Sequence, residues 1–79
     1  MQQGDVVLSL FGHDKGRKYL IFSQSCDTML CVDGKLRKLS NPKRKNIKHL
    51  ELIGEPNQRF DFNNANILDA HIRKFLKNF

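Results

Sequence analysis

The sequence predicts a small, mostly β protein: a five-stranded, highly curved barrel over residues 1–54, followed by a linker and an amphipathic C-terminal helix over residues 55–79. Three observations lead to this fold class. Short runs of β-forming residues alternate with turn residues through about the first fifty positions, the hydrophobic period becomes helical towards the end, and 79 residues allow one small core. A barrel covers its own strand edges and needs little core, which suits a chain of this length.

Three strands are expected in the first part of the chain, over residues 5–11, 18–25 and 28–32. The first is rich in Val and Leu, and Val6, Leu8 and Leu10 share one face at period two. The break after it contains Gly12 and Gly16, which adopt backbone angles that other residues avoid. A turn at residues 26–27 separates the second strand from the third.

Asp33-Gly34 comes next and suits the two-residue turn of a twisted hairpin. The sequence therefore predicts a fourth strand over residues 35–39, with Leu36 facing inward and Arg37 facing outward. Asn41-Pro42 is expected to end this strand, because proline cannot donate to a strand ladder and restrains the residue before it.

A fifth strand is expected over residues 48–53, with Leu50 and Leu52 on one side. The segment Gly54-Glu55-Pro56-Asn57 then marks a boundary, and beyond it the apolar residues recur at helical spacing. The expected helix begins with either Asn64 or Asp69 as its cap. Its apolar face is formed by Ile67, Leu68, Ile72, Phe75, Leu76 and Phe79, with Arg73, Lys74 and Lys77 opposite.

Positive charge is concentrated in the first part of the chain. The protein carries 14 Lys and Arg against 8 Asp and Glu, a formal net charge of +6. Residues 1–50 hold ten basic and four acidic residues, whereas residues 51–79 hold four of each. The window from Lys35 to Lys48 contains seven basic residues and no acidic one. Such a cluster repels itself, so it indicates either a polyanionic partner or a solvated loop that aids solubility. We favour a binding surface.

Several other classes of protein are disfavoured. The longest apolar runs are four residues, far short of a membrane span, and the N-terminus does not resemble a signal peptide, so a cytoplasmic location is expected. Cys26 and Cys31 are five residues apart and the histidines are scattered, which is not the spacing of a zinc site. Cys31 is expected in the core as a reduced thiol. No catalytic constellation, metal or cofactor is expected.

Two segments near the N-terminus resemble a KOW motif, which is a strand, a glycine-bearing loop with basic residues, and a second strand. They are Gly4-Asp5-Val6-Val7 and Gly12-His13-Asp14-Lys15-Gly16-Arg17. The later stretches are similar to small bacterial KOW-domain RNA-binding proteins, which are relatives of eukaryotic and archaeal large-subunit ribosomal proteins. These stretches are residues 32–39, 42–45, 48–50 and the tail at 69–74.

The resemblance covers roughly residues 4–53, and Phe11 departs from it, because a small residue is usual there. It implies an SH3-like barrel that binds structured RNA without catalysis. It also implies an association with ribosomal RNA, ribosomes or translation.

Binding to RNA phosphates requires cations that project from a fixed frame. Basic residues border the glycine-bearing loop, the expected hairpin turn, and the following loop and strand. Gly16 is included because its missing side chain lets RNA approach the backbone, although it is equally well explained as a turn residue. The predicted RNA-binding residues are Lys15, Gly16, Arg17, Lys18, Lys35, Arg37, Lys38, Lys43, Arg44, Lys45 and Lys48.

Base recognition has three candidate side chains, Phe11, His13 and Tyr19. Tyr19 and Phe22 fall on opposite faces of the second strand, so at least one of them is expected in the core. We therefore expect recognition of RNA shape and backbone, with little sequence preference. The alternative function is a protein–protein interaction adaptor that docks through the barrel or through the tail helix.

Overall fold

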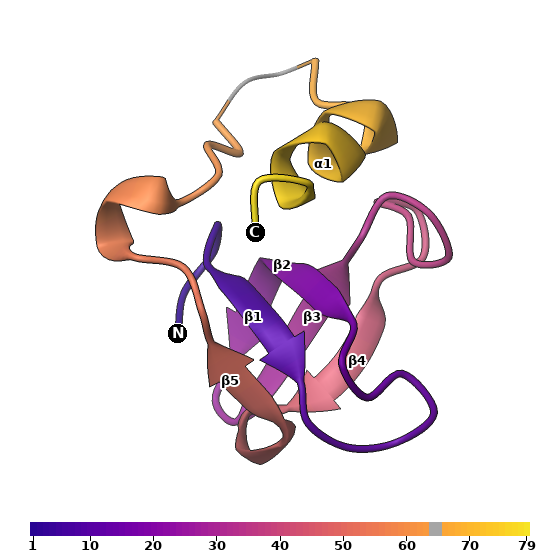
Figure 1. Cartoon of the computed structure of the whole chain (residues 1–79), viewed down its shortest axis with the longest axis vertical. Coiled ribbons are helices and arrows are strands. Elements are labelled where there is room, and N and C mark those ends of the chain that lie inside the picture. The colour runs from indigo at the N-terminus through magenta and orange to yellow at the C-terminus, as the bar shows by residue number, and fades with distance from the viewer. Residues whose placement is uncertain (64–65) are drawn as a thin grey trace.

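The computed structural model describes residues 1–63 and 66–79 (Figure 1). Its strands form one antiparallel sheet in the order β4-β3-β2-β1-β5. The strands are β1 (Val6–Ser9), β2 (Lys18–Ser25), β3 (Thr28–Val32), β4 (Lys43–Asn46) and β5 (Leu50–Leu52). The helical elements are the short 3-10 helices η1 (Ile47–His49) and η2 (Pro56–Gln58), and the α-helix α1 (Asp69–Leu76). The mostly β fold with a C-terminal helix is confirmed.

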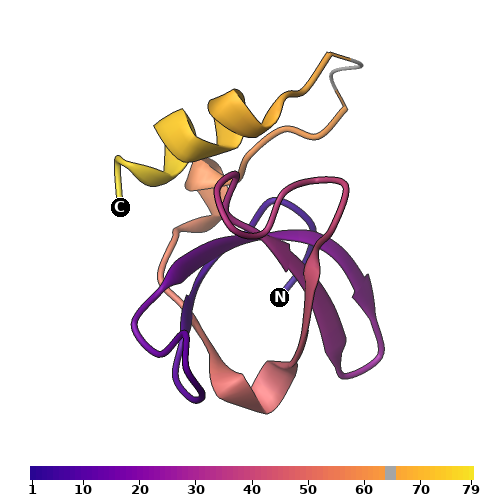
Figure 2. The ribbon, with the colours of Figure 1, turned by 90° about the vertical axis from the view of Figure 1, so that its right-hand side faces the viewer.

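The sheet is strongly curved, and Figure 2 shows its strands curling around one interior with α1 outside. The pairing of β2 with β3 shifts register between Ile21 and Ser23, so Phe22 has no opposite residue on β3. Such a bulge bends and twists a strand. Strands β4 and β5 are the two edges of this sheet and are connected in sequence through η1, so the sheet is open.

Both faces of the sheet are buried. The inner cluster, on the concave face, consists of Val7, Tyr19, Ile21, Met29, Cys31 and Leu50. The outer cluster lies on the other face and consists of Val6, Leu20, Val32 and Ile72, with eight partly buried residues around them. Because neighbours in a strand point to opposite faces, consecutive residues of β1 enter different clusters. The first strand is therefore buried on both faces, and it spans only Val6–Ser9 of the predicted residues 5–11.

Helix α1 covers the outer face of the sheet. Ile72 is fully buried there, and the apolar side chains Phe75, Leu76 and Phe79 pack around it. Five phenylalanines of this layer make edge or tilted ring contacts, with ring centroids 4.8 Å apart for Phe60–Phe62 and 5.1 Å apart for Phe60–Phe75. The tail therefore contributes to the same core as the strands.

The cap of α1 differs from the expectation. Leu68 occupies the N-cap position, and its backbone N–H donates to His71 Nδ1 at 3.0 Å. Asp69 is the first helical residue, and its carboxylate accepts from the backbone N–H of Leu39 at 2.8 Å. The prediction of Asp69 as the N-cap is therefore wrong. The other predicted cap, Asn64, lies outside the described residues.

The second and third strands have the predicted bounds, whereas the fourth strand was misplaced. Residues 34–37 form bends and residues 39–40 a turn, and β4 begins only at Lys43. The carboxylate of buried Asp33 accepts from the backbone N–H groups of Lys35 at 2.9 Å and Arg37 at 2.8 Å. An aspartate side chain that satisfies these donors favours a turn over a strand. Leu36, predicted to face inward, is 68 % exposed.

The fifth strand is shorter than predicted. Its first residues form η1, because the Asn46 side chain accepts from the backbone N–H of Lys48 at 2.9 Å and caps a single helical turn. Only residues 50–52 pair with β1. Leu50 is buried in the inner cluster, whereas Leu52, at the end of β5, is 47 % exposed.

Candidate functional site

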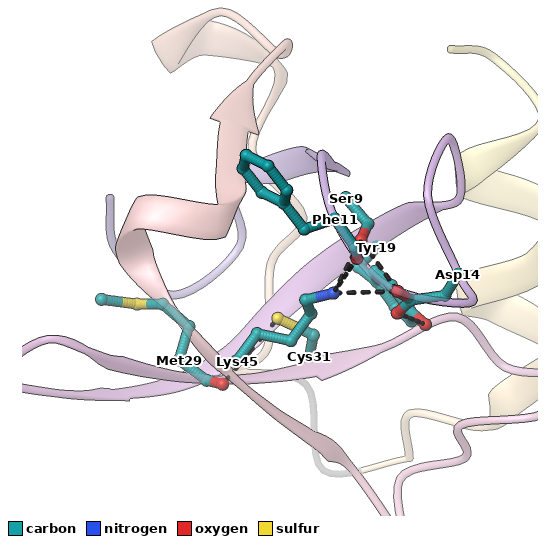
Figure 3. Close-up of polar contacts among 7 residues, drawn as sticks. All are labelled: Ser9, Phe11, Asp14, Tyr19, Met29, Cys31 and Lys45. Atoms are coloured by element: carbon teal, nitrogen blue, oxygen red, sulfur yellow. Dashed lines mark hydrogen bonds and ion pairs between the residues drawn. The ribbon is translucent and has the colours of Figure 1, made fainter.

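A buried polar cluster fixes the loop between β1 and β2 (Figure 3). Lys45 extends from β4, and its Nζ donates to Ser9 Oγ at 2.7 Å, to the carbonyl oxygen of Phe11 at 3.2 Å and to Asp14 Oδ1 at 2.9 Å. The hydroxyl of Tyr19 donates to Asp14 Oδ2 at 2.8 Å. All three ammonium donors of Lys45 are thus satisfied, as a buried lysine requires.

The electrostatics of this cluster follow from its burial and its partners. Burial on its own raises the pKa of Asp14, but hydrogen bonds from Lys45, Tyr19 and Ser9, with the positive charge of Lys45, lower it far below its usual range. Burial raises the pKa of Tyr19 well above its usual range, and the hydrogen bond to Asp14 adds to this. Burial likewise raises the pKa of nearby Cys31 to about 12. The pair of Asp14 and Lys45 is therefore a fixed ion pair at neutral pH.

This arrangement changes the role of two predicted residues. Lys45 is only 8 % exposed and pairs with Asp14, so we leave it out of the proposed binding surface. Tyr19 is 1 % exposed, and its hydroxyl is bonded to Asp14, so it offers no ring face for stacking a base. Phe22 lies on the opposite face of β2 in the outer cluster, as the sequence predicts.

The loop between β3 and β4 is held against α1, as both ribbon views show (Figures 1 and 2). The guanidinium of Arg73 donates to the carbonyl oxygen of Gly34, and the carboxylate of Asp69 accepts from Leu39, five residues further along the loop. Gly34 has a φ of +77°, and a Cβ there would collide with the carbonyl oxygen of Asp69. The helix and the loop therefore fit closely only with glycine at this position.

Two adjoining hollows lie between these two loops, and the first of them also reaches the end of α1. The first hollow, of about 380 Å³, is lined by Gly16, Arg17, Lys18, Asp33, Lys35, Leu36, Arg73, Leu76 and Lys77. The second hollow, of about 440 Å³, is lined by His13, Asp14, Arg17, Tyr19, Leu36, Arg37, Asn41 and Lys43. Arg17 and Leu36 line both. Basic side chains outnumber acidic ones in each lining, so both hollows suit anionic groups.

The two acidic residues in these linings are already engaged. Asp14 is paired with Lys45, and Asp33 accepts from two backbone N–H groups of its own loop. The charge of Asp14 is therefore offset by Lys45, whereas Asp33 remains one negative charge facing the five Lys and Arg side chains of the first lining.

The structure brings together six of the residues that the sequence predicts for RNA binding. Around the hollows lie Gly16, Arg17, Lys18, Lys35, Arg37 and Lys43. Lys15 and Lys38 are exposed on the same two loops but do not line either hollow. Arg44 instead lies by the β2–β3 hairpin, and Lys48 is exposed on η1, so these two are not gathered with the rest.

Sequence reasoning missed Arg73 and Lys77, which complete the first hollow from the helix. Helical spacing does place both on the polar side of the helix, but it does not reveal that the C-terminal end of α1 adjoins the loop that carries Lys35. Gly16 has a φ of +89° with open space around it, which explains it as a turn residue at the rim of the first hollow.

Phe11 and His49 form an exposed aromatic pair outside the hollows. Their ring centroids are 5.1 Å apart with a tilt of 56°, and Phe11 is 58 % exposed. Phe11 follows the end of β1, and His49 immediately precedes β5. The two segments are held side by side, because the backbone N–H of Leu10 donates to the carbonyl oxygen of His49.

No helix within residues 1–63 and 66–79 has the length and apolar character needed to cross a membrane. Over the same ranges, no three side chains of His, Cys, Asp or Glu are placed to hold a metal ion. Comparison of the sequence with known protein families and with curated proteins finds no match in either.

Proposed function

We propose that this protein is a non-catalytic RNA-binding protein that grips structured RNA through its backbone phosphates. The observation that carries the proposal is the gathering of basic side chains around two adjoining hollows. Three segments that are distant in sequence supply these charges: the β1–β2 loop, the β3–β4 loop and the end of α1. Lys and Arg side chains held by a rigid frame are the usual means of binding phosphate oxygens.

The frame around the hollows supports this proposal. The buried Lys45–Asp14 pair fixes the first loop, and contacts from Asp69 and Arg73 fix the second. Charges on loops that are already ordered bind a polyanion without a large loss of conformational entropy. The first of these loops contains the glycine-bearing segment that resembles a KOW motif, so we propose that the curved sheet is an SH3-like barrel of the KOW type.

The RNA that we propose as partner is ribosomal RNA, and the proposed setting is the ribosome or translation in the cytoplasm. The family resemblance supports the choice of partner, while the hollows support only the chemistry of phosphate recognition. The family resemblance and the hollows are independent lines of support, so the identity of the RNA and the role of the hollows are tested separately.

A protein adaptor that docks through its tail helix gains no support from the packing. The apolar side chains of α1, including Ile72 and Phe75, lie in the outer cluster against the sheet. A partner that needed this face would have to displace the helix and open the core. We therefore propose RNA binding alone.

The test is recovery of RNA with the tagged full-length protein from cell lysate at low salt, followed by sequencing. The proposal predicts enrichment of a few discrete regions of ribosomal RNA that are lost in a high-salt wash. A groove variant, in which Lys18, Lys35 and Lys43 are all changed to Ala, should recover much less RNA. Recovery of a single protein partner with no RNA above background would contradict the proposal.

The matched control removes three charges that do not line either hollow, by changing Arg44, Lys48 and Lys74 to Ala. It should recover nearly as much RNA as the wild type. Equal losses in both triple variants would mean that net charge, rather than the hollows, determines binding.

A further inference from the structure

Leu36 is exposed at the boundary between the two basic hollows. It lines both of them, and it is 68 % exposed although it is a large apolar residue. Its neighbours Lys35 and Arg37 each line one of the two hollows. An apolar side chain is therefore presented to solvent between two places that suit phosphates.

The exposure of Leu36 is imposed by a loop that is held at three points. Asp33 accepts from the backbone of Lys35 and Arg37, on either side of Leu36. Gly34 is held by Arg73 on α1, and Leu39 is held by Asp69 on the same helix. The leucine thus projects from an ordered turn, and an ordered apolar contact loses little entropy when a ligand covers it.

Arg17 is the other residue that lines both hollows, and it comes from the β1–β2 loop. A guanidinium is planar, so it stacks on a nucleic-acid base as well as attracting phosphate. The boundary between the hollows therefore offers a base an apolar contact from one loop and a planar cation from the other. Phosphates on either side of that base would face the remaining cations.

A base reaches such a place only if it is not paired in a helix. In double-stranded RNA the bases are stacked inside and the protein meets backbone and ribose, whereas bulges and loops display bases that proteins contact directly. The combination of two cation-lined hollows and a central apolar contact therefore fits one unpaired nucleotide flanked by phosphates.

We propose that the site recognises structured RNA containing an unpaired nucleotide, whose base contacts Leu36 and Arg17 while its flanking phosphates occupy the two hollows. This inference rests on the proposed RNA-binding function and names the feature of the RNA that the site selects. It adds one base contact to the expected recognition of RNA shape and backbone.

The test compares two labelled RNA hairpins, identical except that one carries a single unpaired adenosine in its stem. Fluorescence anisotropy with the wild-type protein should show about fivefold tighter binding to the bulged hairpin, since each apolar or stacking contact adds modestly to affinity. Leu36→Ala should abolish this preference, because it should weaken binding of the bulged hairpin about fivefold more than binding of the paired hairpin. Arg17→Lys should reduce the preference in the same way, because it keeps the charge but removes the planar group.

Two controls keep the outcomes distinct. Leu52→Ala truncates another exposed leucine, which does not line either hollow, and should keep the preference for the bulged hairpin. Thermal unfolding checks that each variant is folded. Loss of the preference in Phe11→Ala, with Leu36→Ala behaving as wild type, would overturn the inference by assigning the base contact to the aromatic pair.

Equal binding of both hairpins by the wild type, with a strong effect of the groove variant, would refute this inference and leave the proposed function standing. Absence of binding to either hairpin would refute both.

Discussion

Replacing Lys45 with Met removes the charge that holds the β1–β2 loop while keeping a long apolar side chain. In the wild type, the side chains of Lys45 and Asp14 are only 7 % and 10 % exposed, and the ammonium makes three hydrogen bonds within 3.2 Å. The variant leaves the Asp14 carboxylate buried without its cation. Breaking a buried ion pair in this way costs about 3–5 kcal/mol.

We expect a loss at the lower end of this range, about 3 kcal/mol, because Asp14 keeps its hydrogen bonds from Tyr19 and Ser9. For a domain of this size, that corresponds to a fall in melting temperature of roughly 12–24 °C. Urea unfolding followed by far-ultraviolet circular dichroism measures the free energy directly.

The matched control is Lys48→Met, which changes an exposed lysine on the adjacent η1. It should alter the free energy of unfolding by less than about 0.5 kcal/mol. The double variant Asp14→Asn with Lys45→Met should be more stable than Lys45→Met alone, because no unpaired charge remains buried. A Lys45→Met protein as stable as its Lys48→Met control would refute the assignment of this ion pair to the interior.

Folding lowers the pKa of Asp14, so its stabilising contribution is present above about pH 4 and is lost as pH falls, and Asp14→Asn should flatten the acid dependence of the unfolding free energy. Cys26 is exposed while Cys31 is buried with its pKa raised to about 12, so a thiol reagent at neutral pH should modify one cysteine quickly and the second only on unfolding; rapid modification of both would contradict this packing. Ile72→Ala should lower the free energy of unfolding by about 2–4 kcal/mol in urea titrations, because it leaves a cavity under α1, and a neutral result would mean that the helix is not docked.

The strands with strong local signals were predictable from the sequence. Strands β2 and β3 have the expected bounds because their apolar residues are continuous and a two-residue turn separates them. The apolar stripe around Ile72 also correctly indicated a helix that needs a covered face, although helical spacing does not identify the surface that covers it.

The segment after β3 was not predictable, because distant residues determine its conformation. Asp33-Gly34 favours a tight hairpin when judged alone, yet contacts from Asp69 and Arg73, more than thirty residues away, hold a wider loop. The true β4 consists of Lys, Arg and Asn, which have little strand preference, and it forms because its backbone pairs with β3.

Contacts between residues distant in sequence also limit what the sequence indicates about the candidate site. The charge window from Lys35 to Lys48 identified the basic loop, but it could not separate Lys45, whose partner Asp14 lies thirty-one positions earlier. Arg73 and Lys77 belong to a part of the chain with no net charge, so only their position beside the loops reveals them.

The salt dependence of RNA binding tests the central claim most directly. We would measure the affinity for one structured RNA between low and moderate salt for the wild-type protein and for the groove variant, Lys18, Lys35 and Lys43 to Ala. About five phosphate contacts predict a log–log slope of roughly −3 to −5 for the wild type, and removal of three lining charges should make the slope shallower by roughly 2 to 3. A wild-type affinity that does not change with salt, or a groove variant with an unchanged slope, would contradict the account.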